Sequence, residues 1–503
     1  MSSTFTALKL INSLSGSEKR HFKLFSDKQQ GEKDYQGLFD IIAENPLTDT
    51  ATIAEVYHKN FPGSSLDNAS RYLIRLITDS LIQSKIDKDN LFHLFQRLMR
   101  VKILQERSLA EEAHHELKKI RKKAEESQNH FVQYMTFRYE LNYLSEVNFP
   151  GMTDTYLVEM QMKAKESLRT MHHIEGHYSL YELLKYRLIH YGGIKSDDDK
   201  RKLNDLLLSE VSLVAGKVKN SFESRKLHLL FQSFFFTHTG DHKSALKTFQ
   251  ELNKLFEQNT DLQEHPPIAY FTSLDGILDS LNSNEQYSQM PFYIEKLSQI
   301  DVVSCPDHFR FLLQKTVAVY SLKLFIQEHN QNGAIAYIKS LDTKIWAAYH
   351  LINVEKRMEL HFYCSLAYFG KKEYKKALKY LIDITPESSR YALLPVYKAV
   401  RLLQIVIHYE LKNAAFLTYE IRSYKRFFQQ KLKLLKSEKL VFKTIQLDPH
   451  NNSPAKNKSL VPRMRQYCQS VAGDKYERAL LKYIDLPAWA LQQFKAKPVN
   501  GNG

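Results

Sequence analysis

SFFFTHTGDHKSALKTF, residues 233–249, is the stretch of sequence that decides the fold. A small residue, Ser233, is followed three positions later by the aromatic Phe236, nine positions after that by Ala245, and four further on by Phe249. The polar run THTGDH between them is typical of a turn. This spacing predicts two antiparallel helices that approach closely at the small side chains, with the large ones filling the space between neighbouring pairs.

A second stretch keeps the same register. SLAYFGKKEYKKALKYL, residues 365–381, places Ser365, Tyr368, Ala377 and Leu381 at the same four positions. The pattern resembles the tetratricopeptide-repeat (TPR) family, whose arrays of helix pairs mostly bind peptides or other proteins along a concave face. The resemblance implies an α-solenoid with a protein-binding role.

The distance between the two stretches bears on the repeat length. Ala245 and Ala377 are 132 residues apart, whereas four repeats of about 34 residues would need about 136. We therefore expect repeat lengths that vary. A weaker copy of the pattern is formed by Val101, Leu104, Ala113 and Leu117.

The composition fits a long helical chain. Its 503 residues exceed the ~250–300 at which a single core stops growing. Gly 16 and Pro 14 are few, which argues against many tight turns and short strands. Apolar residues recur at spacings of three and four almost throughout, as at Phe309, Leu312 and Leu313. We predict an all-α fold with at least ~70% helix, built as an α-solenoid of TPR-like antiparallel helix pairs with a small N-terminal helical domain.

Changes in sequence texture divide the chain into four segments. Residues 1–88 are predicted to form the small helical domain and residues 89–445 the TPR-like solenoid. Residues 446–462 are rich in Asn, Pro and Ser and are predicted to be a polar linker. Residues 463–503 are expected to form short C-terminal helices and a disordered tail.

The N-terminal domain has two interpretations. It is a bundle that caps the first exposed face of the solenoid, or it is a helix-turn-helix over residues 53–83. In the second case Ser70, Arg71 and Arg75 stand at the front of a DNA-recognition helix. No glycine occupies the expected turn position and no strand pair follows as a wing, which favours the capping bundle.

The sequence lacks the common motifs for catalysis and cofactor binding. No Gly-x-Ser-x-Gly elbow, dinucleotide fingerprint or Cys-x-x-Cys pair occurs. His173 and His177 would share a helical face, but Gly176 is expected to interrupt the helix, which places them on a solvated helix end. We therefore expect no enzyme activity, no cofactor and no metal site. An active site assembled from distant helices is the remaining alternative.

Cysteine usage and hydropathy bear on the compartment. Cys305, Cys364 and Cys468 are far apart and odd in number, which is typical of reduced thiols in the cytoplasm. No run approaches the ~20 apolar residues that cross a bilayer. The first residues lack the basic leader and apolar core of a secretory signal. We expect a cytoplasmic protein without a membrane span.

Positive charge is concentrated near the C-terminus. The net charge is +15, and residues 421–465 hold twelve Lys and Arg against two acids, Glu438 and Asp448. The candidate basic partner-binding patch comprises Arg422, Lys425, Arg426, Lys431, Lys433, Lys436 and Lys439. Its spacing predicts one long amphipathic helix with a basic outer face for an acidic protein segment or a nucleic-acid backbone. A solvated face that only aids solubility is the alternative.

These features predict a scaffold or adaptor that binds a peptide or protein partner on its helical-repeat surface. The alternative is a regulator whose N-terminal domain binds nucleic acid and whose TPR-like repeats sense a peptide or protein. The two hypotheses differ in the role of residues 1–88.

Overall fold

The computed structural model describes most of the chain in helical form. The described residues are 2–28, 34–45, 49–86, 89–190, 194, 196–216, 221–264, 266–303, 305–341, 343–347, 354–382, 384, 394–429, 434–449 and 452–494. Helices account for 82% of them, and these ranges include no strand. The predicted all-α fold is therefore confirmed. Within the same ranges no helix combines the length and the apolar character needed to cross a bilayer.

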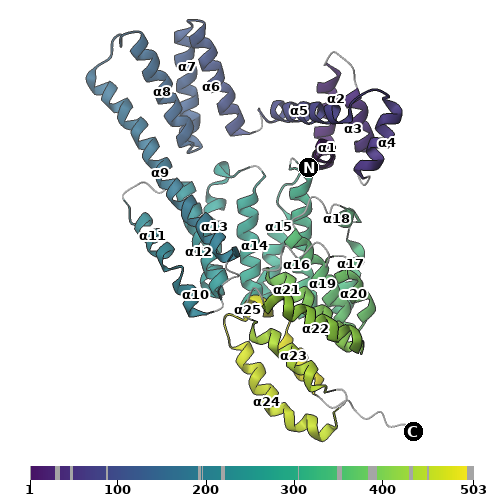
Figure 1. Cartoon of the computed structure of the whole chain (residues 1–503). Helices are drawn as coiled ribbons and strands as arrows, with labels where there is room; N and C mark the ends of the chain where they lie inside the picture. Colours follow the sequence, from purple (N-terminus) through teal and green to yellow (C-terminus); the bar gives the residue numbers. More distant parts are fainter. Residues whose placement is uncertain are drawn as a thin grey trace.

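The first five helices form a bundle at one end of the molecule (Figure 1). They are α1 (Ser3–Ser13), α2 (Gly16–Asp27), α3 (Asp34–Glu44), α4 (Thr50–Asn60) and α5 (Leu66–Lys85). α5 packs against α1, α2 and α3, and its buried Leu73 and Ile77 share one apolar core with Leu38 and Ile42 of α3. α5 is therefore the central helix of the bundle.

The residues considered for DNA recognition do not form one exposed surface. Ser70 is fully buried, and its hydroxyl lies 3.3 Å from that of Thr4 in α1. Arg71 pairs with Asp67 at 2.6 Å, and Arg75 stacks on a tyrosine of its own helix. Placing Ser70 at the front of a recognition helix is wrong, because α5 turns this side toward α1.

The next helices form a layer that leads into the body of the molecule. They are α6 (Asn90–Glu106), α7 (Ala110–Glu126), α8 (His130–Glu146) and the 37-residue α9 (Asp154–His190). α9 packs on α8 and then on α11 (Asn204–Val214) and α12 (Phe222–Thr239), with the short α10 (Asp197–Arg201) before α11. Figure 1 shows α9 running from the α6–α8 layer into the body.

From α12 onward the described chain is arranged in helix pairs that lie side by side (Figure 1). They are α12 with α13 (His242–Gln258), α14 (Ile268–Ser283) with α15 (Met290–Ser298), α16 (Asp307–Gln327) with α17 (Gln331–Ser340), α19 (Val354–Gly370) with α20 (Tyr374–Ile382), and α21 (Pro395–Glu410) with α22 (Ala414–Gln429). The second helix of each pair contacts the first helix of the next pair. Short elements in the connections are η1 (Thr260–Leu262), η2 (Tyr287–Gln289) and α18 (Thr343–Ala347).

One turn geometry ends the first helix of each of these pairs. A residue with φ between +54° and +76° stands at each turn: Gly240, Glu285, His329, Lys372 and Lys412. The N–H of this residue donates to the carbonyl three residues earlier. The N–H of the next residue donates to the carbonyl five residues before itself. These two hydrogen bonds satisfy carbonyls that the helix end would otherwise leave free.

The repeat is longer than the family pattern implies. The left-handed residues follow one another at intervals of 45, 44, 43 and 40 residues. Ala245 and Ala377 each stand five residues after such a residue, so the 132 residues between them hold three repeats of about 44 rather than four of about 34. Met290 and Ala334 occupy the equivalent position in the two intervening pairs, and both are fully buried.

The residues that carry the repeat pattern lie in the packed interior. Ser233 and Ala245 are fully buried, and the Ser233 hydroxyl donates to Thr248 Oγ1 at 3.0 Å. Phe249 belongs to the apolar cluster around α13 and α14, and Phe236 packs half-buried against it. The residues of the second copy are also buried: Ser365, Tyr368, Ala377 and Leu381.

Enlarging Ala245 is expected to destabilise the protein. Ala245 is 0% exposed, so Ala245→Leu should overpack the contact between α12 and α13 and lower the free energy of unfolding by ~1–3 kcal/mol. Thermal denaturation measures the change, with Lys243→Leu at an exposed position of α13 as the control. A Tm equal to that of the wild type would contradict the packing described here.

The C-terminal helices first leave the body and then return to it (Figure 1). They are α23 (Lys436–Leu447), α24 (Pro454–Ala472), α25 (Arg478–Leu481) and α26 (Leu486–Gln493). α24 begins inside the predicted linker and contains Pro462, so the linker prediction is wrong from residue 454 onward. Burial of Met464, Cys468 and Val471 on one side of α24 offsets the unfavourable proline. The predicted disordered tail lies outside the described residues from position 495 onward.

Candidate functional site

The basic patch predicted from the sequence is divided between two helices. Its members in α22 are Arg422, Lys425 and Arg426, and those in α23 are Lys436 and Lys439. Two further members, Lys431 and Lys433, lie outside the described residues. Because α22 ends at Gln429 and α23 begins at Lys436, the prediction of one long helix is wrong.

The described members of the patch differ in their surroundings. Three are exposed and form no ion pair with a described residue: Arg422, Arg426 and Lys439. Lys425 is half-buried, with Nζ 5.1 Å from the centre of the Phe442 ring. Lys436 Nζ lies 2.7 Å from Asp474 Oδ2, and the hydrogen bond and charge of Asp474 raise the pKa of Lys436. Lys436 therefore links α23 to residues 473–485, which follow α24 and include α25; we call them the returning segment.

One acid of the basic segment, Glu438, points into the protein. Its Oε1 lies 3.2 Å from Nζ of Lys398 in α21 and accepts a hydrogen bond from the Tyr424 hydroxyl in α22. Its Oε2 accepts the backbone N–H of Leu435. Burial, followed by the charge of Glu438, raises the pKa of Tyr424 well above its usual value. Glu438 is fully buried and joins three helices, so it contributes no negative charge to the surface.

The surface of α23 and α24 carries exposed cations and little opposing charge. From residue 449 to residue 473 the sequence contains no Asp or Glu. α24 exposes four cations that form no ion pair with any described residue: Lys456, Lys458, Arg463 and Arg465. We call these four residues together with Lys439 the C-terminal basic face.

A second group of charges lies between the helix pairs and the returning segment. Lys482, just after α25, places Nζ 3.0 Å from Asp279 Oδ1 of α14. The Tyr483 hydroxyl donates to Glu359 Oε1 of α19 at 3.3 Å. Burial alone would raise the pKa of Asp279, but the charges of Lys482 and Lys323 lower it. These contacts connect α14 and α19 through the returning segment.

Lys315 in α16 is a buried lysine, and unlike Lys482 it forms no ion pair with a described residue. It is 1% exposed, and its Nζ has no hydrogen-bond partner among the described residues. Burial lowers the pKa of Lys315 to about 6, an effect larger than the opposing influence of Glu359. The side chain is therefore mostly uncharged at neutral pH.

His173 and His177 lie in the middle of α9 and not at a solvated helix end. Their side chains are buried, with 6% and 2% exposure. The helix continues through Gly176 because Leu213 of α11 packs there: a Cβ at Gly176 would lie 3.2 Å from its methyl groups. The predicted interruption at this glycine is wrong.

Glu210 of α11 connects the two helices that pack on the second half of α9. Its Oε1 lies 3.3 Å from Nδ1 of His177 and 2.7 Å from Nδ1 of His228 in α12. Burial would raise the pKa of Glu210, but the interactions with the two histidines lower it. Across the described ranges, no group of three or more His, Cys, Asp or Glu side chains is arranged to hold a metal ion.

The first half of α9 has an open side. In the described ranges, the polar contacts of α11 and α12 with α9 begin at His173 and extend to Arg187. Before that point α9 packs on α8, with Met160 and Ala164 in their shared core. Figure 1 shows α11 beside the lower part of α9. The layer of helices beside α9 thus stops halfway along it.

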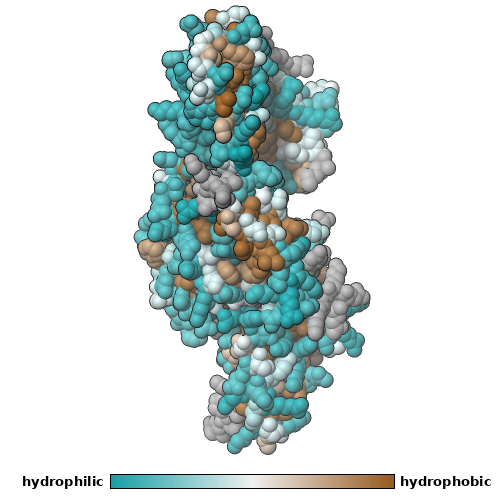
Figure 2. Space-filling model, turned by 90° about the vertical axis from the view of Figure 1, so that its left-hand side faces the viewer, coloured by the Kyte–Doolittle hydropathy of each residue, from teal (hydrophilic) through white to brown (hydrophobic). Residues whose placement is uncertain are grey.

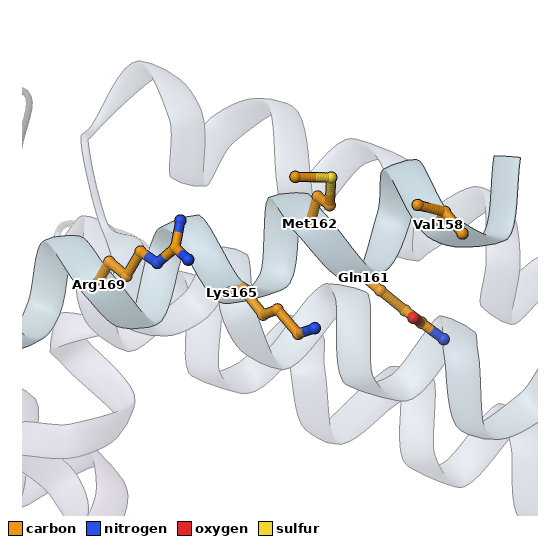
Figure 3. A pocket seen from close by; sticks show the side chains of 5 residues that line it. All are labelled: Val158, Gln161, Met162, Lys165 and Arg169. Carbon is orange, nitrogen blue, oxygen red and sulfur yellow. The ribbon is translucent and has the colours of Figure 1, made fainter. Parts of the chain in front are cut away.

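A surface hollow of about 270 Å³ follows the first half of α9 (Figure 3). It is lined by Val158, Gln161, Met162, Lys165 and Arg169, which we call the α9 face. Figure 3 shows Val158 and Met162 on one side of the helix and Gln161 and Lys165 on the other. Val158 is 52% exposed and Met162 61%. Neither Lys165 nor Arg169 forms an ion pair within the described part of the chain.

Other exposed apolar side chains lie on the same side of the molecule as the α9 face. Figure 2 shows two hydrophobic areas on the side that α9 and α11 occupy in Figure 1. Leu208 and Val211 of α11 are 69% and 66% exposed. Contiguous exposed apolar surface of this kind marks sites of protein contact.

The α9 face was missed in the sequence, although a signal for it was present. Apolar residues such as Tyr156, Val158 and Met162 occur on more of the circumference of the first half of α9 than the side around Met160 and Ala164. That is more than one buried side of a helix requires.

No family model, curated protein or solved structure matches this chain.

Proposed function

We propose that the chain is a protein-interaction scaffold or adaptor, an α-solenoid of TPR-like helix pairs that holds a protein partner on the α9 face. The observation that carries this proposal is the exposure of Val158 and Met162, beside two cations that pair with no described acid, at the point where the neighbouring helix layer stops. The stacked helix pairs with one recurring turn support the solenoid. Their repeat of about 44 residues is longer than the ~34 of a tetratricopeptide repeat.

The partner that fits the α9 face is an amphipathic helix with acidic side chains. Such a helix, laid beside the first half of α9, would continue the layer that α11 occupies lower down. Its apolar side would cover Val158 and Met162, as amphipathic helices do when they bind in grooves. Carboxylates three or four residues apart on the same helix would reach Lys165 and Arg169. The apolar contacts would supply most of the affinity, and the charges would orient the partner.

Placing charges on the α9 face is expected to abolish partner binding. In Val158→Asp/Met162→Asp the two carboxylates would lose hydration on binding and repel the acidic partner, so the retained partner should fall at least ~10-fold. The measurement is quantitative affinity purification of the full chain from its native cells. Val303→Asp is the matched control, because Val303 is 86% exposed and lies outside the α9 face. Recovery of the same proteins in equal amounts from all three forms would refute the proposal.

A further inference from the structure

We propose that the C-terminal basic face binds the phosphate backbone of a nucleic acid. This site is separate from the α9 face: α24 lies at the opposite end of the molecule from the first half of α9 (Figure 1). The inference therefore goes beyond the proposed protein-binding function and does not depend on it.

The C-terminal basic face has little opposing charge beside it. Of the three acids that flank the face in sequence, Glu438 is 0% exposed and bound to Lys398, Asp474 is paired with Lys436, and Asp448 at the end of α23 is half-buried. Since residues 449–473 contain no acid, the cations of α24 face solvent without neutralisation from their own helix. A surface of this kind attracts polyanions.

The cations of α24 are arranged in rows along the helix. Lys456 and Arg463 are seven residues apart, and so are Lys458 and Arg465. Seven residues are close to two helical turns, so each pair forms a row along the helix, with about 10 Å between its two charges. The two rows lie on opposite edges of the exposed side, because the buried Met464 marks the inner side between them. Two rows of cations flanking a neutral strip suit a backbone that carries charge at regular intervals.

The polar character of the surrounding surface favours a nucleic acid over an acidic protein. Among the described residues from 434 to 494 no large hydrophobic side chain is exposed. Protein interfaces are centred on apolar or aromatic anchors, whereas interfaces with nucleic acid are polar and strongly positive. The C-terminal basic face is polar and positive, as interfaces with nucleic acid are. The α9 face has exposed apolar side chains, as protein interfaces do. Contacts of this type position a backbone without reading its base sequence.

The test is fluorescence anisotropy with the full chain and a labelled 20-base-pair DNA duplex at 50 mM and 200 mM salt, with a labelled 20-nucleotide RNA in parallel. The variant Lys456→Gln/Lys458→Gln/Arg463→Gln/Arg465→Gln removes four cations of the face. We expect it to bind at least ~10-fold more weakly at 50 mM salt. The slope of log affinity against log salt should become shallower by about 3 to 4 for the duplex, close to 0.9 for each lost phosphate contact.

The matched control changes four exposed lysines of α7 that stand among acidic residues: Lys118, Lys119, Lys122 and Lys123. It loses the same net charge, and it should keep wild-type affinity within about twofold if the face is specific. Circular dichroism verifies that each variant is folded. Absence of binding by the wild type at 50 mM salt would overturn the proposal, and so would equal losses in the two variants. Labelled polyglutamate that binds as tightly as the duplex would overturn the assignment to nucleic acid in favour of an acidic protein.

Discussion

Glu438→Ala is expected to lower the free energy of unfolding by ~3–5 kcal/mol, the range found when one partner of a buried ion pair is removed. Glu438 is fully buried, and Lys398 beside it is 4% exposed. Without the carboxylate, the Lys398 ammonium, the Tyr424 hydroxyl and the Leu435 N–H would all lose their acceptor. Denaturation in urea measures the loss, and the slope of unfolding free energy against urea should stay unchanged.

The double variant Lys398→Met/Glu438→Leu is the control for this prediction. It removes both charges and replaces them with side chains of similar size, so it should recover much of the stability that Glu438→Ala loses. A double variant as unstable as the single one would show that the polar contacts of Tyr424 and Leu435 dominate. A single variant as stable as the wild type would contradict the role given to Glu438 as the residue that joins α21, α22 and α23.

Lys315→Met is expected to stabilise the protein, and by an amount that depends on pH. The pKa of Lys315 is about 6 in the folded chain, against an ordinary value of 10.5. Between these two values the unfolded chain binds more protons, so wild-type stability rises with pH across that window. At 1.36 kcal/mol per pH unit, the gain from removing the amine is about 5 kcal/mol at pH 7 as an upper bound. It should shrink toward zero near pH 10.5.

The measurement is urea denaturation of the wild type and Lys315→Met at pH 7 and at pH 10. Lys315→Arg is the matched control, because a guanidinium keeps its charge and should destabilise the chain at both pH values. A Lys315→Met protein that is less stable than the wild type at pH 7 would mean that Lys315 is charged and paired in the native state.

The sequence predicts the helices well and the connections poorly, for physical reasons that particular residues make clear. Of the five turns that end the first helices of the pairs from α12 to α22, only the one at Gly240 has the residue type that a left-handed turn favours. Glu285, His329, Lys372 and Lys412 adopt the same conformation without glycine. Because no residue type marks these turns, the repeat length near 44 could not be obtained from the pattern at Ser233 and Ser365.

Tertiary packing also overrides local signals at two helix breakers. Gly176 continues α9 because the missing side chain admits Leu213. Pro462 stands inside α24, which is held by buried Met464 and Cys468. Local propensity predicts an interruption at both residues, and contacts with other helices decide otherwise.

The candidate sites differ in how far the sequence reveals them. The charge of residues 421–465 is a property of composition, so the basic segment could be found without a structure. The inward direction of Glu438 depends on Lys398, forty residues earlier. The α9 face depends on where α11 stops beside α9, which no local pattern encodes.

Photo-crosslinking at the α9 face tests the central claim most directly. A p-benzoylphenylalanine introduced in place of Met162 in the full chain, and in place of Val303 as the reference, would be activated in native cells and the products identified by mass spectrometry. The account predicts one recurring protein crosslinked from position 162 through a segment with helical spacing of apolar and acidic residues, and its absence from position 303. The same products from both positions, or none from position 162, would contradict it.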